Sequence, residues 1–133
     1  MLFMQLDNLR KTAEKLDIDL ILLFGSRVDG SFRKDSDFDI AYFSEKPVES
    51  FGDIFQPLMQ YIGSDNLHIV HIDLKKVKPL FLYQIMNNCK LLYAKNTMNF
   101  YNLRVYAIKR YHDEVKPLFK IKFERLKAEY LSK

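Results

Sequence analysis

Apolar residues recur along the first part of the chain at the spacing of an α-helix. Leu6, Leu9, Ala13 and Leu16 fall three or four positions apart, which predicts a helix over residues 2–16 with one apolar side. The apolar run LILLF follows and ends in Gly25 and Ser26. A short apolar run bounded by turn residues predicts a buried strand over residues 21–24. A short polar helical piece comes next, and then a second strand.

Later patterns alternate between helix and strand. We expect a helix over residues 51–61 that stops near Gly63, a strand over residues 66–74, and a helix that opens at Pro79, since proline suits the first turn. Residues 90–93 predict a short edge strand. Residues 97–111 and 117–132 predict two C-terminal helices, separated or kinked at residues 113–117. Strands alternating with helices indicate an α/β or α+β fold.

The length and composition predict one packed domain. The chain has 133 residues, of which 48% are hydrophobic and 14% aromatic. That is enough for a hydrophobic core but leaves no room for a second domain. We therefore expect a single domain over residues 1–133, with a core over residues 1–94 and a helical extension over residues 95–133.

The cysteine and hydropathy patterns narrow the cellular setting. The single cysteine, Cys89, excludes an internal disulfide and cannot form a zinc site alone. The longest apolar runs are too short to span a bilayer, and the N-terminus lacks the pattern of a signal peptide. We expect a cytoplasmic protein with no membrane partner.

Charge is distributed unevenly along the chain. Residues 1–94 carry eleven Lys and Arg against thirteen Asp and Glu, a net charge of −2, and residues 95–133 carry ten against four, a net charge of +6. A basic extension can meet an acidic protein, a nucleic acid or water. The charge alone does not choose among these.

Two carboxylates in the second strand are the first candidates for chemistry. Asp37 and Asp39 are two residues apart, so they project from the same face while Phe38 and Ile40 point the other way. Paired carboxylates repel each other unless a cation lies between them, and oxygen ligands select a hard ion such as magnesium. An Asp-x-Asp pair is also common as a solvated turn.

Gly25 and Ser26 add a candidate phosphate site ahead of this pair. They lie where a strand leads into a helix N-terminus, whose free amides and dipole attract phosphate. A simple turn is the competing interpretation of these two residues alone. Together, a phosphate site and a metal-binding pair outline a nucleoside triphosphate site.

The residues of this segment resemble a known signature, that of the polymerase-β-type nucleotidyltransferase superfamily. The matching residues are Gly25-Ser26-Arg27, Gly30 and Ser36-Asp37-Phe38-Asp39-Ile40. The short chain is similar to the minimal nucleotidyltransferases (MNT), the antitoxins that accompany HEPN-domain toxins. The resemblance implies an α+β fold with a small mixed sheet flanked by helices, and it covers the C-terminal helices only loosely.

The resemblance also implies a third carboxylate and metal-dependent transfer. The family's third acid falls on a strand after the second helix, and Asp73 is the candidate; a strand-end acid that faces solvent or pairs with Lys75 or Lys76 is the alternative. Asp37, Asp39 and Asp73 would hold Mg²⁺, as two ions, and ATP would be the substrate. Gly25 and Ser26 would bind its phosphates. Arg27 could add charge there, or lie at the surface.

Three functions remain open. The resemblance implies an antitoxin that transfers AMP from ATP to a tyrosine of a HEPN RNase toxin, because a chain this short has no acceptor domain of its own. A second hypothesis is an antitoxin that works by binding alone. A third is a small-molecule or RNA nucleotidyltransferase that acts as a homodimer, although we do not expect direct nucleic-acid binding.

Two further patterns have plain structural interpretations. His71 is expected to be a strand histidine with a satisfied hydrogen bond. Most aromatic and leucine side chains of the C-terminal helices are expected to lie in the core, and some of them to form a surface for a partner. These positions are Phe100, Leu103, Tyr106, Tyr111, Phe119, Phe123 and Tyr130.

Overall fold

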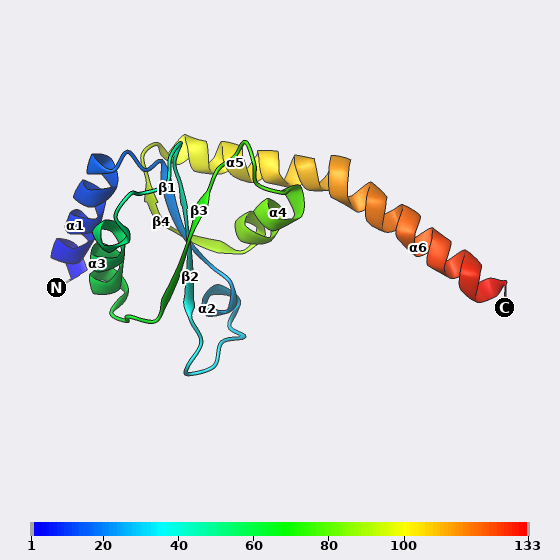
Figure 1. Ribbon diagram of the computed structural model, residues 1–133, viewed down its shortest axis with the longest axis horizontal. Helices are drawn as coiled ribbons and strands as arrows, with labels where there is room; N and C mark the ends of the chain where they lie inside the picture. Colours follow the sequence, from blue (N-terminus) through cyan, green and yellow to red (C-terminus); the bar gives the residue numbers. More distant parts are fainter. Residues whose placement is uncertain (1, 133) are drawn as a thin grey trace.

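The computed structural model describes residues 2–132 and has a four-stranded mixed sheet at its centre (Figure 1). The strands are β1 (Leu20–Phe24), β2 (Phe38–Phe43), β3 (Leu67–Ile72) and β4 (Cys89–Ala94). Their order across the sheet is β3-β2-β1-β4. β1 is antiparallel to β2 and to β4, whereas β2 and β3 are parallel. The expected mixed sheet is confirmed, and β4 is one of its edges.

Helices cover both faces of the sheet. The helices are α1 (Leu2–Lys15), α2 (Ser26–Asp29), α3 (Phe51–Ile62), α4 (Pro79–Asn87), α5 (Thr97–Arg110) and α6 (Lys116–Leu131). α1 and α3 supply Leu9 and Leu58 to the core on one face. α4 and α5 supply Leu82 and Phe100 to the core on the other.

Alternation along the strands divides the side chains between these two cores. On β1, Ile21 faces α1 and α3, whereas Leu22 faces α4 and α5. On β2, Ile40 and Ala41 divide in the same way. Side chains of a strand point alternately to opposite faces, so Asp39 lies on the α4 and α5 face with Ala41.

Most predicted elements are present, and their ends follow from local residues. α3 ends at Gly63, whose backbone takes the left-handed conformation (φ 83°) and donates to Met59 O. Glycine adopts this conformation without the strain that a Cβ brings. Pro79 opens α4, as expected. β2 begins at Phe38, so Asp37 lies just before the strand and not within it.

The two C-terminal helices are joined by a π-helical turn, η1 (Tyr111–Val115), and not by a break. Pro117 then sits in the first turn of α6, where a missing N–H costs nothing. The wider turn absorbs the irregularity, and the chain continues as one long, kinked helical arm.

α6 projects away from the sheet (Figure 1). Every side chain from Lys116 to Leu131 is exposed, including Phe119, Phe123 and Tyr130. The prediction of core is therefore wrong for these three residues and for Tyr106, which is 45% exposed, while it is confirmed for Phe100, which is buried in α5. Within residues 2–132, no helix is both long enough and apolar enough to cross a membrane.

Candidate functional site

The turn between β1 and α2 is shaped by Gly25. Its backbone has φ 80° and ψ −154°, a combination that is nearly restricted to glycine. A Cβ at this position would overlap with Oδ2 of Asp39 and lie 3.3 Å from Asp39 Cγ. Glycine is thus required twice, by the backbone conformation and by the close approach of a carboxylate.

Strand pairing brings Asp39 to this turn. In the antiparallel register of β1 and β2, Phe24 lies opposite Asp39. The Asp39 side chain is 28% exposed, and Asp37, two residues earlier, is exposed. The structure therefore brings the predicted turn together with Asp39 of the predicted acidic pair.

The start of α2 offers backbone amides but little helix dipole. Val28 N and Asp29 N donate to Gly25 O at 3.0 and 3.2 Å, so the amides of Ser26 and Arg27 precede the first hydrogen-bonded turn. α2 has only four residues, so its macrodipole is much smaller than the sequence analysis assumed. Phosphate binding here would depend on amides and on the Ser26 hydroxyl.

Arg27 is occupied within the protein. Its Nη2 donates to the carbonyl of Ser36 at 2.8 Å, and the same guanidinium reaches the carbonyl of Lys34. The guanidinium also lies over two rings, 4.5 Å from the centroid of Phe32 and 4.3 Å from that of Phe38. In this structure Arg27 holds the segment that leads to Asp37. The N–H groups and the planar face of its guanidinium both contact residues of that segment.

The segment from Gly30 to Asp37 has further anchors at both ends. Asp29 accepts hydrogen bonds from Ser31 through the Ser31 hydroxyl and backbone N–H, and these bonds lower the pKa of the Asp29 carboxyl. At the other end, Asn66 Nδ2 donates to the carbonyl of Asp35 at 3.1 Å. These hydrogen bonds restrain the segment that leads to Asp37.

Asp73 lies at the opposite end of the sheet from the acidic pair. In the parallel register, Asp39 is level with His68, and Asp73 comes five residues later, roughly 16 Å along the strand direction. Its carboxylate accepts from the backbone N–H of Lys75 at 2.9 Å and so closes a turn after β3. It also lines a cavity of about 780 Å³ beside Phe43 and Tyr106. The structure does not bring Asp73 to Asp37 and Asp39.

His68 is the residue that the sequence analysis missed. Its Nδ1 lies 3.2 Å from Asp39 Oδ1, and its side chain is 64% exposed. The alternation His68, Val70, Ile72 along β3 could have placed it on one face, but only the pairing of β3 with β2 places it beside Asp39. His71 has the satisfied hydrogen bond that was expected, 2.9 Å from Nε2 to the carbonyl of Ser44.

The donor set suits one magnesium ion better than two. Mg²⁺ commonly binds one or two carboxylates, with water and substrate phosphates completing its shell, and Asp37 and Asp39 can supply that pair. Among residues 2–132, no group of three acidic, histidine or cysteine side chains is arranged to hold a metal. The three-carboxylate set that was expected for two ions is thus incomplete here.

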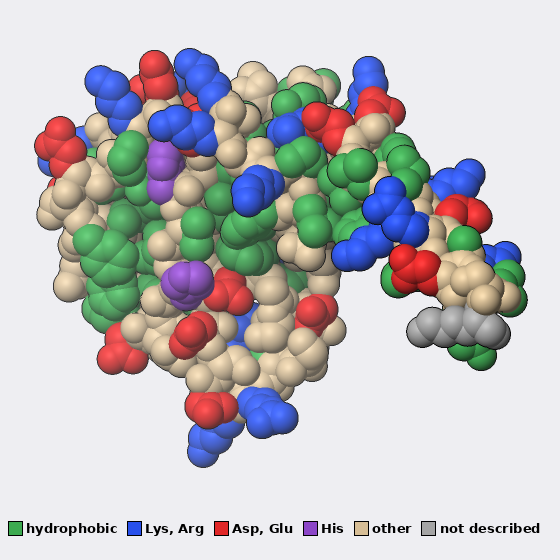
Figure 2. All heavy atoms as spheres, turned by 45° about the vertical axis from the view of Figure 1, so that its right-hand side comes forward, with side chains coloured by type: hydrophobic (Ala, Val, Ile, Leu, Met, Phe, Trp, Pro, Cys, Tyr) green, Lys and Arg blue, Asp and Glu red, His purple; other side chains and the backbone are tan. Residues whose placement is uncertain are grey.

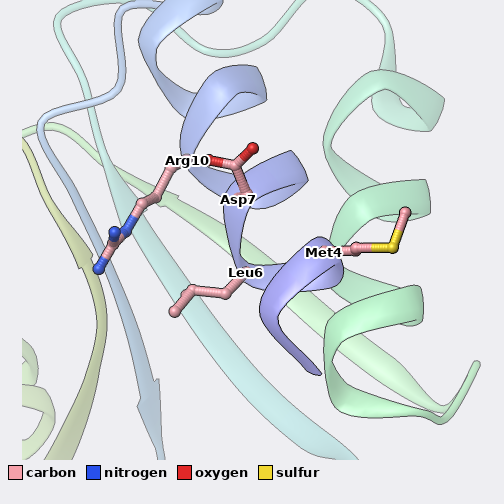
Figure 3. A pocket seen from close by; sticks show the side chains of 4 residues that line it. All are labelled: Met4, Leu6, Asp7 and Arg10. Atoms are coloured by element: carbon pink, nitrogen blue, oxygen red, sulfur yellow. The ribbon is translucent and has the colours of Figure 1, made fainter. Parts of the chain in front are cut away.

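Two other features of the described residues, a hollow on α1 and the thiol of Cys89, show no arrangement suited to chemistry. A hollow of about 390 Å³ on α1 is lined by Met4, Leu6, Asp7 and Arg10, whose side chains point in different directions (Figure 3). Cys89 lies opposite Phe24 at the start of β4, and burial raises the pKa of its thiol, with Arg104 partly opposing this. A raised pKa makes the thiol a poorer nucleophile.

Comparison with known proteins identifies a family and a fold. The family described as "Polymerase beta, Nucleotidyltransferase" matches residues 7–98. A solved structure described as a toxin–antitoxin with AMP-PNP has a TM-score of 0.63 at 21% identity, covering 91% of this chain and 98% of that chain. A complex of tri-AMPylated Shewanella oneidensis HEPN toxin with MNT antitoxin has a TM-score of 0.59 at 19% identity, covering 95% and 99%. A comparison with curated proteins found no match. At these identities, the structures demonstrate a shared fold.

Proposed function

This chain belongs to the polymerase β nucleotidyltransferase family, and from this premise we propose that it transfers AMP from ATP to a tyrosine hydroxyl of a HEPN-domain toxin. Transfer would neutralise the toxin and make this protein an antitoxin. The observation that carries the proposal is the contact of Asp39 with the Gly25 turn. It joins Asp39 of the acidic pair to the turn that would bind phosphate.

The similar structures support the choice of nucleotide and acceptor. One is described with AMP-PNP, an ATP analogue, and another contains a HEPN toxin that carries AMP groups. Their alignments span at least nine tenths of this chain, so the likeness is not confined to the helices. A protein acceptor also suits the exposed helical arm α6.

The chemical step is a displacement at the α-phosphorus of ATP. The tyrosine oxygen forms a bond to this phosphorus, the bond to the bridging oxygen of the β-phosphate breaks, and pyrophosphate leaves. The tyrosine proton would pass to a base, and we propose His68 for this role, because its Nδ1 lies 3.2 Å from Asp39 Oδ1. Gly25 allows the phosphates to approach the backbone, and Ser26 donates to their oxygens.

Asp37 and Asp39 are the residues that would hold magnesium. When bound, the ion would neutralise charge on the triphosphate and stabilise charge that develops at the α-phosphorus. Arg27 would contribute indirectly, since its guanidinium holds the segment that carries Asp37.

Isotope labelling tests which group is transferred. A HEPN-domain toxin protein would be incubated with this protein, Mg²⁺ and ATP labelled at either the α- or the γ-phosphate. We expect protein-bound label from α-labelled ATP only. Label from γ-labelled ATP would indicate phosphoryl transfer, and label from neither would contradict a transferase function.

A second candidate function is an antitoxin that works by binding alone. The specific observation in its favour is the position of Asp73, which leaves the acidic pair without a third carboxylate. This candidate predicts a stable complex in which the toxin is inhibited without ATP. Inhibition that requires ATP and Asp39 would exclude it.

A further inference from the structure

The projecting helix α6 carries a stripe of large apolar side chains. The stripe consists of Phe119, Phe123, Leu126 and Tyr130, at intervals of four, three and four residues. This spacing places them on one side of the helix. Leu118 and Ile121 are exposed on its other sides, so α6 is not strictly amphipathic and the four residues are its longest aligned apolar set. Their exposure ranges from 51% to 80%. We call this set the apolar stripe.

Nothing in the described chain covers the apolar stripe. Leaving several large apolar side chains in water forgoes the free energy gained by burying them. Contiguous exposed apolar patches of this kind typically mark a binding surface. Figure 2 shows green hydrophobic side chains along the projecting arm, interleaved with charged ones. The arrangement indicates an interface and not a core.

The spacing of the stripe fits a helix as its partner. Apolar residues at alternating intervals of three and four form the seam at which two α-helices pack. α6 has 16 residues, so it offers a seam roughly 24 Å long.

Charge beside the stripe selects an acidic partner. Lys116, Lys120 and Lys127 each come three residues before a stripe residue, so all three border the same edge. α6 as a whole carries five Lys and Arg and two Glu, a net charge of +3. Two copies of this helix would bring their lysines together, which disfavours self-association.

We propose that the apolar stripe docks an α-helix of the acceptor protein, with acidic side chains along the edge that faces Lys116, Lys120 and Lys127. The identity of that acceptor as a HEPN-domain toxin rests on the proposed function. Docking on α6 would hold the acceptor against this chain while a tyrosine reaches the nucleotide.

Binding measurements on single variants test the stripe. Phe123→Ser removes a stripe residue, and Ile121→Ser is the matched control, because Ile121 is 57% exposed and lies on the opposite side of α6. With a purified HEPN-domain toxin as the probe, we expect Phe123→Ser to raise the Kd about tenfold or more. Ile121→Ser should leave it within about twofold. Equal effects of the two variants would overturn the proposal.

A charge reversal tests the acidic partner. Lys120→Glu alters the lysine edge, and Arg125→Glu makes the same change of charge on the far side of the helix. We expect Lys120→Glu to weaken binding more than Arg125→Glu, with the difference shrinking at high salt. Tighter binding by Lys120→Glu would contradict an acidic partner helix.

Two comparisons separate this inference from the proposed function. Asp39→Asn should abolish AMP transfer and keep the Kd for the toxin, whereas Phe123→Ser should raise the KM for the toxin and keep kcat. Loss of kcat in Phe123→Ser with an unchanged Kd would overturn the docking role. Light scattering, which measures the oligomeric state, gives a further check. If this chain forms a dimer that Phe123→Ser dissociates without changing toxin binding, the stripe binds a second copy of the chain and the proposal is refuted.

Discussion

Gly25 links the backbone of the β1–α2 turn to the carboxylate of Asp39. Its φ of 80° excludes most other residues, and the space that a Cβ needs is filled by Asp39 Oδ2. A change at this single position therefore alters the turn and the acidic site together.

Gly25→Ala should lower both stability and nucleotide binding. We expect a loss of about 1–3 kcal/mol in the free energy of unfolding from backbone strain, measured by urea denaturation. Displacement of Asp39 should also weaken the binding of MgATP, measured by calorimetry. Gly63→Ala is the control, because Gly63 has a similar φ of 83° but an alanine Cβ there would meet no other atom within 4 Å. A Gly25→Ala variant that binds MgATP normally would contradict the account of this turn.

His68 should matter for transfer and not for folding. Its exposed side chain contributes little to the core, so His68→Ala should change the free energy of unfolding by no more than about 0.5 kcal/mol. If His68 accepts the tyrosine proton, the rate of transfer should fall by about 100-fold. His112→Ala, at an exposed histidine on η1, should leave the rate unchanged. A normal rate in His68→Ala would remove His68 from the mechanism.

Sequence patterns were sufficient for residues that lie close together along the chain. Gly25 and Asp39 lie within a short segment, so their spacing and the strand period were enough to predict that they lie near each other. Asp73 and His68 depend on the register of β3 against β2, which is set by packing over the whole sheet. The sequence pointed to Asp73 and not to His68 because no local pattern fixes that register.

Among the elements, the connection between α2 and β2 is held by one side chain. Arg27 stacks against Phe32 and Phe38 and donates to the carbonyls of Lys34 and Ser36. The planar guanidinium can stack on rings and donate hydrogen bonds in its plane at the same time, and an ammonium group cannot reproduce this geometry.

Arg27→Lys should loosen this connection without unfolding the domain. We expect faster cleavage by trypsin at Arg33 and Lys34 and a reduced rate of transfer, while the sheet is preserved. Arg33→Lys retains a trypsin site in the same exposed segment and serves as the control. Equal cleavage rates in the two variants would show that Arg27 does not hold the segment.

The ends of helices could be predicted from the sequence where a single glycine or proline determines them. Gly63 and Pro79 ended and opened helices as expected. A separation or kink near residues 113–117 was expected from Pro117, but its form, a π-helical turn over residues 111–115 that joins the two helices, was not predicted by any local pattern.

For the whole molecule, the exposed helix α6 shows that helical spacing does not predict which surface an apolar side of a helix packs against. The stripe positions predict which residues share a side, and the structure agrees with that. Spacing does not tell whether the side packs on the chain's own sheet or on another protein. α5 packs on the sheet through Phe100, but α6 extends beyond it, so the same pattern becomes core in one helix and surface in the next.

The central claim is nucleotidyl transfer at Asp37 and Asp39, and intact-mass spectrometry of the HEPN-domain toxin tests it most directly. The toxin would be incubated with this protein, Mg²⁺ and ATP, beside an Asp37→Asn/Asp39→Asn variant as the control. The account predicts a mass gain in whole adenylyl units with the native protein and none with the variant. A stable complex without any mass gain would contradict the transferase account and leave an antitoxin that acts by binding.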